Sequence, residues 1–192
     1  MRFPHISTLV LATVLASGCS TTPDTPVATS DPAEARGPSL DVNAFAIEHV
    51  VEVEVPPIEA FDAFTGDITA WWDHSFAETP ASIVIEPWPG GRFLETFREG
   101  STDGALHAVV TRAERGQLLA FTGPLGFAAL GVHFDMVHML RFEETESGTR
   151  LTMSVVGVGT SQPGWKEAVQ SVWHHFLDDR FKPFVEGRLD AG

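Results

Sequence analysis

Residues 163–185 read PGWKEAVQSVWHHFLDDRFKPFV and contain the pattern that decides the fold. Their apolar side chains recur at helical spacing, at Trp165, Val169, Val172, Trp173, Phe176, Phe181 and Phe184. This period predicts an amphipathic helix that begins near Pro163, a residue suited to a first helical turn. Pro183 lacks a backbone N–H, so we expect it to bend or fray the last turn. The segment is therefore expected to be one long closing helix that covers a sheet.

Upstream of this helix, the spacing changes to the alternation of β-strands. Residues 46–55 place Val51 and Val53 on one face and Glu52 and Glu54 on the other, as in a half-buried strand. Turn-forming residues separate further expected strands at 82–86, 92–97, 105–113, 118–122, 132–142 and 150–158. Two short helices are expected between the first two strands, at 58–64 and 68–72. The order predicts an α+β fold, with a curved antiparallel sheet of about seven strands wrapped on the C-terminal helix.

Several motifs in this order resemble the SRPBCC superfamily, also called START-like or helix-grip. The branch most similar is that of the heat-shock-protein ATPase-activator homologues. The similarity spans about residues 47–186 and rests on VEVEVPP at 51–57, FDAF at 61–64, WW at 71–72, EPWPGGRF at 86–93, GTRLT at 148–152 and the terminal aromatic helix. The resemblance implies a curved antiparallel sheet that grips the last helix, often with an apolar cavity between the two.

The N-terminal residues indicate export. A short apolar run at 6–16 follows Arg2 and ends in Ser17-Gly18-Cys19, a pattern that resembles bacterial lipoprotein signals. Residues 1–18 are thus predicted to be a lipoprotein signal peptide, with Cys19, the single cysteine, as the lipid attachment point. An ordinary secretory cleavage that leaves a free thiol is the alternative.

The rest of the chain divides by composition. Residues 19–43 are rich in Ser, Thr and Pro and predict a disordered tether, while 44–192 suit one folded domain. We expect the domain to face the periplasm of a bacterial cell envelope, and Ser20 resembles the sorting pattern for the outer rather than the inner membrane. Export would also separate the protein from cytosolic chaperones, so chaperone activation is not expected.

Charge and motifs exclude several functions. The net charge of −14 repels nucleic acid and anionic headgroups, so membrane contact is expected only through the lipid on Cys19. The sequence contains no Gly-x-Ser-x-Gly elbow, and its glycines do not form a phosphate loop. No cofactor is predicted.

Strand parity predicts the lining of the expected cavity. In residues 132–142 the even positions form a largely apolar face that should point inward. With aromatic residues from the helices, the candidate ligand-binding residues are Trp71, Trp72, Phe134, Met136, His138, Trp173 and Phe176. For each of these residues, a purely structural place in the core is the alternative.

Two polar residues are the weak catalytic candidates. His138 is expected among apolar neighbours, where it is either a hydrogen-bonded core residue or a polar contact for a ligand. Glu95 shares its parity with Phe93 and Phe97; it is either buried and in need of a partner or exposed on the outer face.

No metal site is predicted. His133 and Asp135 point to one face of their strand and His138 to the other, so these side chains cannot converge without a bulge. The neighbours His174 and His175 diverge by about 100° around a helix and form no chelate alone.

These observations leave alternative functions. The first is the binding of a small hydrophobic molecule between the sheet and the C-terminal helix. The second is a cavity enzyme, like the cyclases and hydrolases of the superfamily, with acid–base roles for His138 and Glu95. The third is an interaction module in which the apolar, glycine-rich loop 123–131 holds an envelope protein.

Overall fold

Eight antiparallel strands form one sheet with the order β1-β8-β7-β6-β5-β4-β3-β2 in this computed structural model. The structure describes residues 42–130, 132–160 and 163–188. The strands are β1 (Asn43–Val53), β2 (Gly66–Asp67), β3 (Ser82–Ile85), β4 (Arg92–Thr96), β5 (Gly104–Glu114), β6 (Leu118–Thr122), β7 (Phe134–Thr145) and β8 (Gly148–Gly159). From β2 to β8 the chain is a meander, and β1 extends the sheet at its other edge by pairing with β8. The predicted curved antiparallel sheet is thereby confirmed, with one short strand more than expected.

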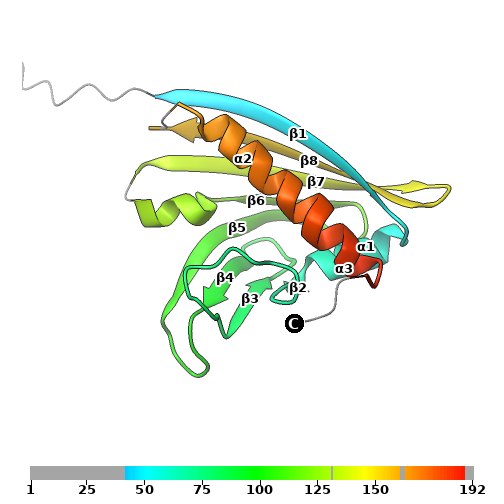
Figure 1. The fold of residues 1–192 in the computed structure, drawn as a ribbon, viewed down its shortest axis with the longest axis horizontal. Helices are drawn as coiled ribbons and strands as arrows, with labels where there is room; N and C mark the ends of the chain where they lie inside the picture. The colour runs from blue at the N-terminus through cyan, green and yellow to red at the C-terminus, as the bar shows by residue number, and fades with distance from the viewer. Residues whose placement is uncertain (1–41, 131, 161–162, 189–192) are drawn as a thin grey trace, which may run out of the picture. The chain divides into compact units, whose positions relative to one another are not determined.

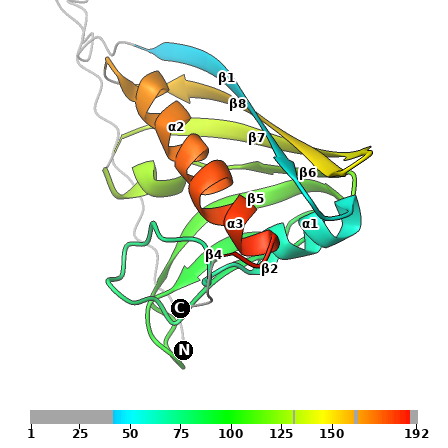
Figure 2. The ribbon, with the colours of Figure 1, turned by 45° about the vertical axis from the view of Figure 1, so that its right-hand side comes forward.

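The C-terminal segment crosses one face of this sheet diagonally (Figures 1 and 2). It consists of α2 (Trp165–His174), a π-helical stretch η2 (His175–Phe181) and α3 (Lys182–Val185). The chain stays helical through Pro183, and the turn before it has π geometry. A proline ring clashes with the carbonyl of an ordinary α turn, and the wider turn relieves this conflict. No helix in the described ranges is long and apolar enough to span a membrane.

Alternation along the strands separates a buried face from an exposed one. On β7, Phe134, Met136, His138, Leu140 and Phe142 are buried, as the parity of the sequence predicted. Val137 lies on the opposite face and is 48% exposed. The buried face packs against the C-terminal helical segment, so the core lies between these two layers.

The expected short helix after β1 is present as α1 (Pro57–Phe64), and it buries Phe61 and Phe64. The second short helix, expected at 68–72, was wrong. Gly66 and Asp67 pair with β3 as β2, and only a single turn follows, in which the N–H groups of Trp71 and Trp72 donate to the carbonyl of Ile68. The N–H of Ile68 still donates to the carbonyl of Ile83 in β3, and the chain leaves the turn after Trp71.

The predicted signal peptide 1–18 lies outside the described residues, as does almost all of the tether 19–43. Both remain predictions from the sequence. The described residues all fall within the structural unit Ser39–Gly192.

Candidate functional site

A cavity of about 500 Å³ lies between the loop after β2, the strands and the C-terminal helix, and the 3₁₀ helix η1 (Leu125–Leu130) borders it. A volume of this size suits a small organic ligand. Most of its wall is apolar. The lining residues are Trp72, Asp73, His74, Ser75, Phe76, His107, Leu125, Gly126, Phe127, Met136, Ala168, Val169, Val172, Trp173 and Phe176.

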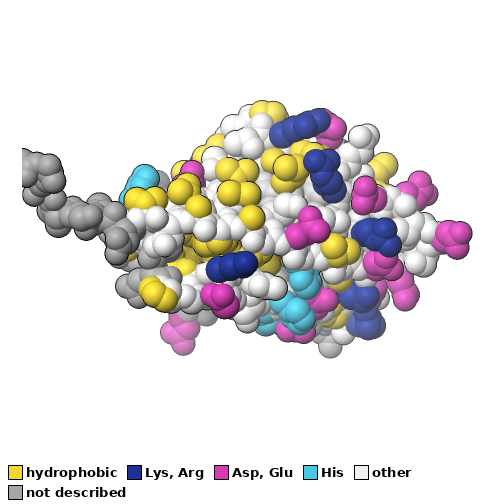
Figure 3. All heavy atoms as spheres, turned by 90° about the horizontal axis from the view of Figure 1, so that it is seen from above, with side chains coloured by type: hydrophobic (Ala, Val, Ile, Leu, Met, Phe, Trp, Pro, Cys, Tyr) yellow, Lys and Arg dark blue, Asp and Glu magenta, His cyan; other side chains and the backbone are white. Residues whose placement is uncertain are grey.

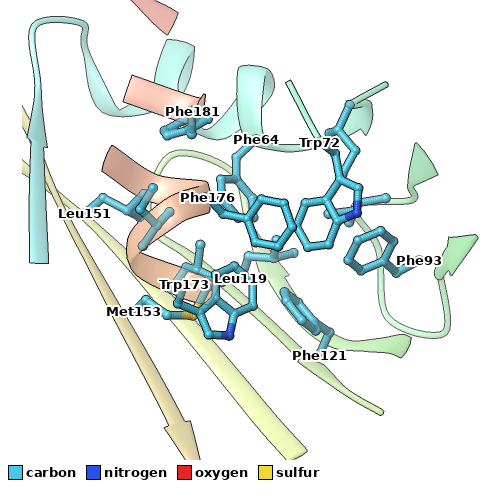
Figure 4. Close-up of a cluster of buried hydrophobic side chains, with 14 of the residues drawn as sticks. Phe64, Trp72, Phe93, Leu119, Phe121, Leu151, Met153, Trp173, Phe176 and Phe181 are labelled. Carbon is cyan, nitrogen blue, oxygen red and sulfur yellow. The ribbon is translucent and has the colours of Figure 1, made fainter. Parts of the chain in front are cut away.

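Four of the predicted ligand-binding residues line this cavity: Trp72, Met136, Trp173 and Phe176. The rings of Trp72 and Phe176 lie face to face, with centroids 3.7 Å apart and an interplanar angle of 12° (Figure 4). Trp173 contacts both rings edge-on. This cluster joins the loop after β2 to the C-terminal helix and forms one wall of the cavity.

The other predicted binding residues lie elsewhere in the core. Trp71 and Phe134 are buried but do not line the cavity. Trp71 packs against Phe64 and Phe181, which joins α1 to the end of the helical segment. Phe134 contacts Trp165 and Phe127. The structure therefore gives Trp71 and Phe134 a place in the packing of the domain.

His138 is fully buried and stands outside the cavity lining. Its ring stacks on Phe121 at 4.7 Å and contacts Trp173 at 5.3 Å. Neither ring nitrogen has a hydrogen-bond partner of normal geometry among the described residues. Burial lowers the pKa of His138 to about 3, and the nearby backbone of Phe121 opposes this shift only in part. The imidazole is thus neutral and packs like an aromatic residue.

Glu95 is also fully buried, and it is paired with a histidine that the sequence analysis did not single out. His107 Nε2 lies 3.0 Å from Glu95 Oε2. The backbone N–H groups of Phe76 and Ala77 donate to the same carboxylate at 2.9–3.1 Å. These donors satisfy the buried carboxylate and tie the loop after β2 to β4.

His107 lies in the cavity wall and is 3% exposed. Its Nδ1 atom is buried and has no hydrogen-bond partner among the described residues. Burial lowers the pKa of His107, and the hydrogen bond and charge of Glu95 oppose this effect. A neutral imidazole whose Nε2–H donates to Glu95 leaves a lone pair on Nδ1, a buried acceptor next to the cavity that no described residue uses.

A β-bulge explains why parity did not reveal His107. Phe93 pairs with Ala108, but Leu94 pairs with Leu106, so His107 is the extra residue of β5. In a regular strand, neighbouring residues point to opposite faces, so His107 would point to the face opposite the buried Ala108. The bulge instead turns it inward, beside Glu95.

The rim of the cavity carries a second polar group. Asp73 Oδ1 lies 2.9 Å from Nδ1 of His74 and 3.0 Å from Nε2 of His175. Arg180 Nε lies 3.2 Å from the other carboxylate oxygen. Although burial opposes the shift, the hydrogen bonds from both histidines and the charges of His175 and Arg180 hold the pKa of Asp73 below its usual value. Figure 3 shows histidine side chains gathered beside acidic ones on one face.

The histidine and aspartate pairs for which the sequence excluded a metal site do not converge in the structure. His133 and Asp135 are exposed, and Asp135 accepts a hydrogen bond from Thr122 instead. His174 is exposed and contacts His49, whereas its neighbour His175 turns toward Asp73. This divergence agrees with the expected helix geometry.

The apolar loop 123–131 folds into η1 over most of its length. Leu125, Gly126 and Phe127 line the cavity, and Phe127 stacks on Trp165 at 4.4 Å. The loop therefore borders the cavity and also packs over the start of α2. The contact of this loop with an envelope protein remains a prediction from the sequence.

A known family matches most of this chain. The model of the family described as "Activator of Hsp90 ATPase homolog 1-like protein" matches residues 54–186. No curated protein shows a significant sequence match.

Solved structures share the fold at low identity. A protein of Rhizobium leguminosarum is 16% identical, with a TM-score of 0.56 over 78% of this chain and 99% of its own. A protein of unknown function from Staphylococcus aureus is 15% identical, with a TM-score of 0.57 over 77% and 96%. The Aha1 dimer of Colwellia psychrerythraea is 16% identical, with a TM-score of 0.51 over 76% and 99%. At these identities the likeness shows the fold alone.

Proposed function

Since this chain belongs to the activator of Hsp90 ATPase homolog 1-like family, we propose that it binds a small hydrophobic molecule in the cavity between the sheet and the C-terminal helix. The family match confirms the resemblance that the sequence motifs indicated. The observation that carries the proposal is the cavity of about 500 Å³ with its wall of Trp72, Met136, Trp173 and Phe176. Such a wall favours apolar surface over water.

The polar part of the wall narrows the chemistry of the ligand. Buried polar atoms are nearly always hydrogen-bonded, and His107 Nδ1 has no partner among the described residues. With Nε2 engaged by Glu95, the free nitrogen accepts rather than donates. The ligand we propose is therefore an apolar molecule with a hydroxyl or N–H donor, which reaches this buried nitrogen after a small shift of the side chains around it. Anionic ligands are disfavoured by the net charge of −14.

Calorimetric titration of the full chain with two matched probes tests this proposal. The probe 1-naphthol has one O–H donor, and 1-methoxynaphthalene has the same ring system without it. We expect both to bind, and 1-naphthol to bind roughly 2- to 10-fold more tightly, the value of one net hydrogen bond of about 0.5–1.5 kcal/mol. The substitution His107→Phe should remove this preference.

A matched pair of substitutions locates the binding. Val172 lines the cavity, so Val172→Trp places a bulky ring at its wall and should weaken the binding of both probes at least about tenfold. Val156 lies on the exposed face of β8, so Val156→Trp should leave binding unchanged. Absence of binding, or equal effects of the two substitutions, would contradict the proposal.

We also propose that a lipid on Cys19 anchors the domain at a bacterial cell envelope, facing the periplasm. The support is the apolar run at 6–16 followed by Ser17-Gly18-Cys19. Expression with a clickable fatty acid should label the protein and place it in the membrane fraction. Cys19→Ser should abolish both the label and the sedimentation with membranes; membrane association that survives this change would refute the anchor.

A further inference from the structure

We propose that Asp73, His74 and His175 form a binding site for one divalent transition-metal ion, such as Zn²⁺, at the rim of the cavity. This inference does not depend on the identity of the apolar ligand. It rests on the convergence of a carboxylate and two imidazoles from segments far apart in the sequence.

The three ligand atoms lie close enough for one ion. Within this part of the structure, single ligand atoms of the three residues lie within 4.8 Å of one another. Asp73 Oδ1 is 2.9 Å from His74 Nδ1 and 3.0 Å from His175 Nε2. Ligand atoms on a tetrahedral Zn²⁺ with bonds of about 2.0–2.1 Å are separated by about 3.3 Å. Small rotations of the side chains therefore suffice to place an ion between them.

Neighbouring groups orient these ligands as in known metal sites. Metal-bound histidines generally offer their second ring nitrogen to a carboxylate, and Asp179 Oδ2 lies 3.4 Å from His175 Nδ1. His175 Nε2 lies 3.0 Å from both oxygens of Asp73, whereas Arg180 Nε contacts only Oδ2, at 3.2 Å. Arg180 can therefore stay on Oδ2 while Oδ1 binds the ion. Arg180 also donates to the carbonyl of Trp71, so the binding of an ion does not leave it without a partner.

The backbone that carries Asp73 and His74 is anchored on both sides. The indole N–H of Trp72 donates to the carbonyl of His74 at 2.6 Å. Farther along the loop, Phe76 and Ala77 donate to the buried Glu95. Opposite them, His175 is the first residue of the π-helical stretch η2, a geometry that often accompanies functional sites. Side chains that are held in place in this way lose less conformational entropy when they bind an ion.

The ligand set also decides the class of ion. Two imidazoles and one carboxylate suit Zn²⁺, Co²⁺ and related ions more than Mg²⁺ or Ca²⁺, which prefer oxygen ligands. Three protein ligands leave a coordination position open. Asp73 and His74 also line the cavity, so the proposed ion would lie beside the proposed ligand space.

Titration with Co²⁺ tests the site, because coordinated Co²⁺ absorbs visible light. The full chain with Cys19→Ser is used, since this change removes the single thiol as a competing ligand. We expect one Co²⁺ per chain with visible absorption bands, and displacement by Zn²⁺, which generally binds such sites more tightly. His175→Ala and Asp73→Asn should each weaken Co²⁺ binding at least about tenfold.

His133→Ala is the matched control, because it removes an exposed histidine that lies outside the site. It should leave Co²⁺ binding unchanged. Asp73→Asn keeps the shape of the side chain, so it tests the site even if His175→Ala does not fold. Failure of the parent chain to bind Co²⁺ would overturn the inference, as would binding that neither Asp73→Asn nor His175→Ala weakens. The naphthol titration is a separate measurement, so either proposal can fail while the other holds.

Discussion

Replacement of His138 by leucine should remove a large part of the acid sensitivity of this domain. Burial lowers the pKa of His138 to about 3, whereas an unfolded chain protonates histidine near its ordinary value of 6.5. As the pH falls through this interval, the unfolded state binds a proton that the folded state cannot accept. The free energy of unfolding is therefore unaffected by His138 when the pH is well above the ordinary pKa of 6.5, and it decreases as the pH falls from there toward 3. Between pH 7 and about pH 4.5, this one residue should remove about 2.5 kcal/mol from the free energy of unfolding.

At pH 7 the same substitution should change stability little. Leucine loses the stacking of the imidazole on Phe121, but it also removes two buried nitrogens that have no hydrogen-bond partner in the described structure. Each unmade hydrogen bond costs about 1–3 kcal/mol, which offsets the lost contact.

Urea unfolding of both proteins at pH 7 and pH 4.5 measures these changes. His107 also has a lowered pKa, but it is present in both proteins, so the difference between their pH dependences isolates His138. We expect the loss of stability between the two pH values to be about 2.5 kcal/mol smaller in His138→Leu. Equal losses in the two proteins would show that His138 is protonated or solvated in the folded state, contrary to its burial.

Two further substitutions probe the packing. Gly157→Ala should destabilise the domain by about 1–3 kcal/mol, because a Cβ there would lie 2.7 Å from the ring of Phe45, whereas Gly126→Ala meets nothing within 4 Å and serves as the control in thermal unfolding. Glu95→Ala should lower the free energy of unfolding by about 2–4 kcal/mol in urea, since it leaves His107 Nε2 and two backbone N–H groups without their acceptor; a loss below about 1 kcal/mol would contradict the role of Glu95 as the buried anchor of the loop.

The strands and the closing helix follow from local patterns. Alternation placed Phe134, Met136 and His138 on the buried face, and the helical period placed Trp173 and Phe176 against the sheet; the structure shows each of them buried. These patterns are reliable because a side chain's direction repeats every two residues in a strand and about every 3.6 in a helix. The prediction of a second short helix was wrong: Gly66 and Asp67 pair with β3 directly before it, a contact between separate segments, and only a single turn follows.

The polar residues of the site are positioned by backbone irregularities, which the repeats of strands and helices do not predict. The bulge in β5 turns His107 toward Glu95, and a bulge arises from the pairing of two strands rather than from one segment. One signal in the sequence indicates His107. It is a titratable residue next to the buried Ala108 in β5, and a buried Glu95 needs a partner of this kind.

The sequence by itself determined the strand alternation, the closing helix, the family resemblance and the strong negative charge, because each of these is a local or summed property of the chain. Only the tertiary structure decided that Asp73, His74 and His175 meet, since Asp73 and His175 are 102 residues apart in the chain. The loop after β2 and the π-helical turn are brought together by packing around Trp72 and Phe176, and packing between distant segments leaves no periodic trace in a single sequence.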